Sequence, residues 1–106
     1  MKTFQTFVNE AMKKSDYEIY HDTYTSAVQS ALDFGRRNGY EFDEEDIFST
    51  VSTGPSKPGR GKTNRLTLKL YKGKPDDLKK TKKALHFQVY NRETNKGTFE
   101  LNAYIG

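Results

Sequence analysis

Three segments in the second half of the chain alternate apolar and polar residues with a period of two. They span residues 66–71, 85–90 and 99–105, and their apolar members are Leu66, Leu68, Leu70, Leu85, Phe87, Val89, Phe99, Leu101, Ala103 and Ile105. Because successive side chains of a strand point to opposite faces, this pattern predicts three strands that each bury one face. Residues 95–97, Asn-Lys-Gly, fit a turn between the last two strands. The sequence therefore predicts an antiparallel meander whose apolar face must be covered.

Helical spacing precedes these strands. One stripe consists of Tyr24, Ala27, Val28, Ala31, Leu32 and Gly35. Asp22 or Thr23 is its candidate N-cap, and Asn38-Gly39 is a stop signal. An earlier stripe consists of Phe4, Phe7, Val8, Ala11 and Met12. The pattern predicts one secure helix and an earlier one that docks on this domain or on a partner.

The segment 47–51, Ile-Phe-Ser-Thr-Val, follows an acidic run at 43–46. Its β-branched and aromatic residues favour a further strand, and a short helix is the alternative. Residues 54–63 and the polar stretch 73–83 are predicted to be loops or turns. The fold class is thus α+β, with an N-terminal helix or helices followed by a four- to five-stranded antiparallel sheet in a single domain, residues 1–106. The sheet is either open with helices on its apolar face or bent into a small Sm-like or SH3-like barrel.

Composition limits the chemistry of the protein. Only 36 of 106 residues are Ala, Val, Ile, Leu, Met, Phe or Gly, which is a thin core for this size, although seven Phe and seven Tyr compensate. The absence of cysteine excludes disulfides, thiolate zinc sites and cysteine nucleophiles. No apolar run is long enough for a signal segment or a membrane span, so no membrane partner is predicted and an intracellular location is the default expectation.

The two halves of the chain carry opposite charge. Residues 1–53 have a net charge of −5 and residues 54–106 a net charge of +9. The segment 57–83 alone holds eleven Lys or Arg against Asp76 and Asp77. Such a segment is typical of a surface that contacts a polyanion, and the acidic half could neutralise it within one chain or between copies.

No catalytic, metal or cofactor motif is present. Gly61-Lys62-Thr63 matches the end of a phosphate-binding loop, but Ser56 stands where the first glycine is required and a strand rather than a helix follows. The two histidines, His21 and His86, lack partners at a recognised ligand spacing. We therefore predict no enzyme activity and no cofactor.

The polar face of the predicted sheet is the candidate binding site. Aromatic side chains next to cations are typical of proteins that bind single-stranded nucleic acid, because bases stack on the aromatic rings and lysines contact the phosphates. The basic loops would extend this surface. The candidate nucleic-acid-binding residues are Lys57, Arg60, Lys62, Arg65, Lys69, Tyr71, Lys79, Lys80, Lys82, Lys83, His86, Tyr90 and Tyr104. The alternative is an ordinary solvated surface, since tyrosine favours strands and lysines protect sheet edges.

Three segments near the C-terminus and the opening residues carry a family resemblance. Residues 62–67, Lys-Thr-Asn-Arg-Leu-Thr, together with 83–91 and the close of the chain at 100–105, resemble small uncharacterised proteins of marine cyanobacterial myophages. The opening residues 1–11 are similar to the starts of many small proteins of those phages. The resemblance implies a protein of the infected bacterial cell, in the host cytoplasm or in the virion. It leaves two hypotheses, a nucleic-acid-binding accessory domain or a structural protein that contacts copies of itself or another virion protein.

Overall fold

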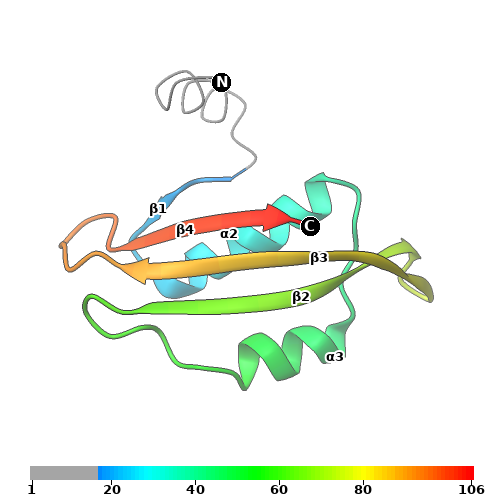
Figure 1. Ribbon diagram of the computed structural model, residues 1–106, viewed down its shortest axis with the longest axis horizontal. Coiled ribbons are helices and arrows are strands. Elements are labelled where there is room, and N and C mark those ends of the chain that lie inside the picture. The colour runs from blue at the N-terminus through cyan, green and yellow to red at the C-terminus, as the bar shows by residue number, and fades with distance from the viewer. Residues whose placement is uncertain (1–16) are drawn as a thin grey trace.

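The computed structural model describes residues 17–106, which form an α+β domain around one four-stranded antiparallel sheet (Figure 1). The elements are β1 (Tyr20–His21), α2 (Tyr24–Arg37), α3 (Glu44–Ile47), the π-helical turn η1 (Phe48–Ser52), β2 (Thr63–Lys74), β3 (Asp77–Asn91) and β4 (Phe99–Ile105). The strand order is β1-β4-β3-β2. The helix predicted around residues 4–12 lies outside the described residues.

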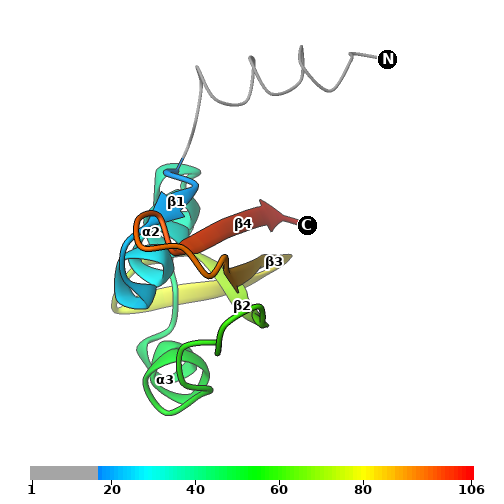
Figure 2. The ribbon, with the colours of Figure 1, turned by 90° about the vertical axis from the view of Figure 1, so that its left-hand side faces the viewer.

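Helix α2 covers one face of the sheet, and within residues 17–106 no helix lies over the other face, which we call the open face (Figure 2). Thr23 caps the helix by accepting a hydrogen bond from the amide of Ser26, and Asn38 with Gly39 ends it, as the sequence predicts. The predicted stripe faces the sheet and is largely buried. This arrangement makes one side of the sheet the core, and the other side carries the partly and fully exposed side chains of the same strands.

The buried face of the sheet consists of the predicted apolar residues. Leu66 lies opposite Phe87, and Val89 lies opposite Leu101, so the three long strands stack their apolar side chains in register. Burying these side chains contributes about 1.5–3 kcal/mol each. The three-stranded meander is therefore confirmed.

The predicted strand at 47–51 is wrong, and the alternative, a short helix, is what forms. Asp43 caps α3 through the amide of Glu45, and η1 continues the helical turn to Ser52. Ile47 and Val51 both pack against the core, whereas Phe48 is exposed. A spacing of four residues puts two side chains on one face of a helix, and this spacing overrides β propensity here.

The fourth strand of the sheet is β1. Tyr20 lies opposite Glu100, and Leu101 donates a backbone hydrogen bond to the carbonyl of Ile19. At the opposite edge β2 pairs with Glu41 through a single bridge at Tyr71. Because β1 and β2 are the two ends of the strand order, the sheet is open and the barrel alternative does not form.

The polar stretch 73–83 is not a loop. It forms the tip of a long hairpin in which Pro75 and Asp76 make the turn and Lys79 lies opposite Lys72. We call residues 71–83 the arm. The arm extends past the core, so most of its residues are exposed on both faces and show no apolar alternation. Lys79, Lys80, Lys82 and Lys83 are consequently strand residues.

Candidate nucleic-acid interface

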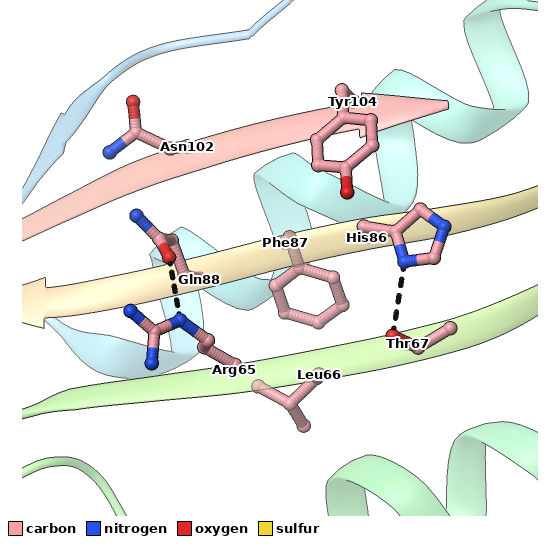
Figure 3. A pocket seen from close by; sticks show the side chains of 8 residues that line it. All are labelled: Arg65, Leu66, Thr67, His86, Phe87, Gln88, Asn102 and Tyr104. Atoms are coloured by element: carbon pink, nitrogen blue, oxygen red, sulfur yellow. Dashed lines mark hydrogen bonds between the residues drawn. The ribbon is translucent and has the colours of Figure 1, made fainter. Parts of the chain in front are cut away.

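The open face of the sheet carries the polar residues that alternate with the core. Two rows cross the strands in register: Arg65, Gln88 and Asn102 form one, and Thr67, His86 and Tyr104 form the other. These six side chains lie in front of the sheet, on the side away from α2 (Figure 3). Together with the intervening Leu66 and Phe87 they line a shallow hollow of about 330 Å³.

One wall of the hollow is a pair of stacked rings. The centroids of His86 and Tyr104 lie 4.8 Å apart at an interplanar angle of 23°. Thr67 holds the imidazole in place, because its hydroxyl lies 3.2 Å from Nδ1 of His86. The ring of Tyr104 is nevertheless 63% exposed. This pair is a rigid aromatic surface that can stack with a further ring.

The other wall is a row of planar polar groups. Arg65 donates from Nε to Oε1 of Gln88 at 3.1 Å, and Asn102 donates from Nδ2 to Oε2 of Glu100 at 3.1 Å. Within residues 17–106 these bonds leave the amide nitrogen of Gln88, the terminal nitrogens of Arg65 and the amide oxygen of Asn102 without a partner. The row therefore offers both donors and an acceptor to a ligand.

The open face continues into the base of the arm, where two lysines meet. Lys69 and Lys80 lie on the same face on either side of a bulge between β2 and β3. Thr81 stabilises the bulge by donating to the carbonyl of Leu70 at 2.7 Å. The proximity of Lys69 and its positive charge lower the pKa of Lys80, with Asp46 acting in the opposite direction. Two exposed positive charges that lie near each other attract an anion.

Tyr71 shares this face with Lys80 but its hydroxyl is already engaged. It donates to Oδ2 of Asp46 at 3.1 Å. Partial burial and then this bond, with the charges of Asp46 and Asp43, raise the pKa of Tyr71. The phenol therefore joins α3 to the base of the arm and is not a stacking surface comparable to Tyr104.

The predicted basic loop lies at the other end of β2. Lys57, Arg60 and Lys62 are exposed, and Arg60 lies 3.7 Å from Glu93. The buried Asn91 fixes the loop by donating to the carbonyl of Pro58 at 3.1 Å. Tyr90, next to Asn91 in sequence, is half-buried on the open face.

The structure thus brings some predicted site residues together and separates others. Arg65, Lys69, His86, Tyr90 and Tyr104 share the open face. The loop and the arm lie at opposite ends of it (Figure 1). The hollow also recruits side chains outside the predicted site, namely Thr67, Gln88 and Asn102. The two-residue period of the sequence already places Gln88 and Asn102 on this polar face, and the same period would have identified Thr67.

A second polar cluster lies beside α2. His21 is only 5% exposed, with Nδ1 at 2.7 Å from the Ser26 hydroxyl and Nε2 at 2.8 Å from the carbonyl of Glu18. In the neutral ring Nε2 carries the proton, because a carbonyl only accepts, and Nδ1 accepts from Ser26. A serine beside a histidine is an arrangement seen in nucleophilic catalysis. Nucleophilic catalysis also requires free backbone amides that can stabilise an oxyanion. The backbone amides of Ser26 and Ala27 instead donate to the hydroxyl and the carbonyl oxygen of Thr23. We therefore interpret the His21–Ser26 contact as part of the structure that begins α2.

Neither a metal site nor a membrane-spanning helix is found in residues 17–106. No group of three or more histidine and carboxylate side chains in this range is placed to hold a metal ion. No helix of this part of the chain is long and apolar enough to cross a bilayer. Comparisons of the chain with protein-family models, with curated proteins and with solved structures find no match.

Proposed function

We propose that this protein is an accessory domain that binds single-stranded nucleic acid along the open face of its sheet and its basic arm. The observation that carries the proposal is the exposed His86–Tyr104 stack, which shares the face of the sheet opposite α2 with the cations Arg65 and Lys69. Bases stack on such rings irrespective of sequence, and lysines meet the phosphates. Because the sequence resembles phage proteins, we propose that the protein binds this nucleic acid inside an infected bacterial cell.

The charge of the arm supports the same ligand. Residues 71–83 contain six lysines and two aspartates. Of the two aspartates, Asp77 lies 3.7 Å from Lys79, and every lysine of the arm is exposed. An exposed array of this kind attracts a phosphate backbone and releases its counterions.

Anisotropy of labelled single-stranded and duplex oligonucleotides, measured across a salt series, tests the proposal. We expect saturable binding that weakens as salt increases and that favours the single strand. The variant Lys80→Gln/Lys82→Gln should flatten the dependence of log affinity on log salt by about 1.4, since each lost contact to a single strand contributes about 0.7.

A matched control removes the same charge elsewhere. Arg37 at the end of α2 and Lys96 in the turn before β4 are both exposed and lie outside the arm. Arg37→Gln/Lys96→Gln should leave the salt dependence almost unchanged. Equal effects of the two variants would show that only net charge matters, and no binding at low salt would refute the proposal.

A second candidate is an assembly function through α3. Phe48 is 62% exposed, and it lies beside Glu44, Glu45 and Asp46, with Ile47 between Asp46 and Phe48 in the chain. An exposed ring beside an acidic patch can accept a basic partner, including the arm of another copy. Sedimentation at low and high salt tests this function. A salt-sensitive oligomer that Phe48→Ser dissociates would support it, and a monomer at all protein concentrations would contradict it.

A further inference from the structure

We infer that the hollow on the open face is a site for one unstacked nucleobase, stacked on Tyr104 and read by the row of Arg65, Gln88 and Asn102. This inference rests on the proposed function and assigns a specific part of the ligand to a specific site. It separates base recognition, at the hollow, from phosphate binding, at the arm.

The stacking surface is already in place before a ligand arrives. Figure 3 shows the rings of Tyr104 and His86 turned outward over β4 and β3. Because His86 packs against Tyr104 and is itself bonded to Thr67, the tyrosine ring has lost much of its rotational freedom. A ring fixed in this way loses less entropy when a base stacks on it. Stacking of one base on an aromatic side chain contributes about 1–3 kcal/mol.

The polar row lies where the edge of that base would fall. Asn102 and Gln88 each stand two residues along their strands from Tyr104 and His86. Two residues of a strand span about 6.8 Å, which is close to the width of a base. The partners within the row orient its groups: Arg65 holds the oxygen of Gln88, so the amide nitrogen of Gln88 is turned away from Arg65. Planar amides and a guanidinium are the groups that recognise base edges.

The ligand must be a base outside a duplex. A paired base within a helix exposes only its edges, and its faces are covered by its neighbours. The ring of Tyr104 can therefore stack only with a base that is unpaired. At the base of the arm, Lys69 and Lys80 are placed to hold an adjoining phosphate.

The test uses short single strands that carry one 2-aminopurine, whose fluorescence is quenched by stacking, and matched strands with an abasic residue at the same position. We expect the protein to change the 2-aminopurine signal and to bind the abasic strand about 5- to 150-fold more weakly. Tyr104→Leu should abolish the signal change and bind both strands equally. Gln88→Leu should lower the affinity for the base-bearing strand and leave the affinity for the abasic strand unchanged.

The control is Tyr20→Leu. Tyr20 is 51% exposed and lies on the same face, opposite Glu100, but its ring faces Arg92 and does not line the hollow. This variant should retain the signal change. Wild-type protein that binds base-bearing and abasic strands equally would overturn the base site and leave phosphate binding intact. Wild-type protein that binds neither strand would refute the proposed function itself.

Discussion

Tyr71 donates its phenolic hydrogen to a carboxylate oxygen of Asp46 across 3.1 Å, and this bond connects α3 to the strand that leads into the arm. The two residues are 25 positions apart in the chain. Together with the backbone bridge between Glu41 and Tyr71, the bond fixes the base of the arm against the helical layer. The two contacts of Tyr71 therefore set the direction in which the arm leaves the sheet.

Replacing Tyr71 by phenylalanine should lower the free energy of unfolding by about 1 kcal/mol at neutral pH, since one hydrogen bond is lost. Burial and the bond to Asp46 raise the pKa of Tyr71, so the folded state favours the protonated phenol. The stabilisation is thus fully present below the unfolded pKa of about 10 and is lost as the pH rises through the folded value. Urea unfolding of the wild-type protein and of Tyr71→Phe, from pH 7 to 11, measures the difference in their free energies of unfolding. Tyr104→Phe is the control. A difference that is constant over this range would contradict the prediction.

The lowered pKa of Lys80 should depend on Lys69. Its principal causes are the close approach of Lys69 and the positive charge of that lysine. In Lys69→Gln the pKa of Lys80 should rise towards 10.5, the value of an unperturbed lysine. NMR titration of the lysine side-chain signals measures the change. Lys72→Gln is the control, because Lys72 lies over the ring of Tyr40. An unchanged pKa of Lys80 in Lys69→Gln would show that the two ammonium groups are not neighbours in solution.

The sequence predicts the regular part of this fold well. Alternation identified the strands that contain Leu68, Phe87 and Leu101, and cap residues identified α2, because both signals are local. The segment from Ile47 to Val51 was mistaken for a strand because its β-branched residues outweighed the four-residue spacing of its two core contacts. The arm was mistaken for a loop because a hairpin that buries neither face has no apolar period.

The candidate site was predictable to a similar extent. The period of two placed His86 and Tyr104 on one face, and only the strand register then made them neighbours. The bond between Tyr71 and Asp46 could not be predicted, because it depends on where α3 packs. The approach of Lys69 to Lys80 depends on a bulge that brings non-opposed residues together, and no local pattern marks that bulge.

His21 should be a stability residue that joins β1 to α2. In His21→Leu the buried ring loses its bonds to Ser26 and to the carbonyl of Glu18, so we expect a decrease of about 1–3 kcal/mol in the free energy of unfolding. Ser26→Ala removes one of the two hydrogen bonds of His21, at a serine that is itself exposed. It should lower the free energy of unfolding by about 1 kcal/mol or less. Thermal and urea unfolding measure both. A destabilisation in Ser26→Ala equal to that in His21→Leu would contradict this interpretation.

Gly73 should control the shape of the arm without controlling the fold. Its φ is +112°, and a Cβ at this position would lie 2.6 Å from the backbone oxygen of Asp77. Gly73→Ala should therefore open the tip of the hairpin, with a local strain of about 1–3 kcal/mol. Amide exchange in residues 74–80 should accelerate while the core strands stay protected, and affinity for single strands should fall several-fold. Gly59→Ala is the matched control, because an added Cβ there meets only Lys62 Cγ at 3.8 Å. Should Gly73→Ala lower the protection of Leu85 and Leu101 as much as that of the arm, the arm folds with the core as one cooperative unit.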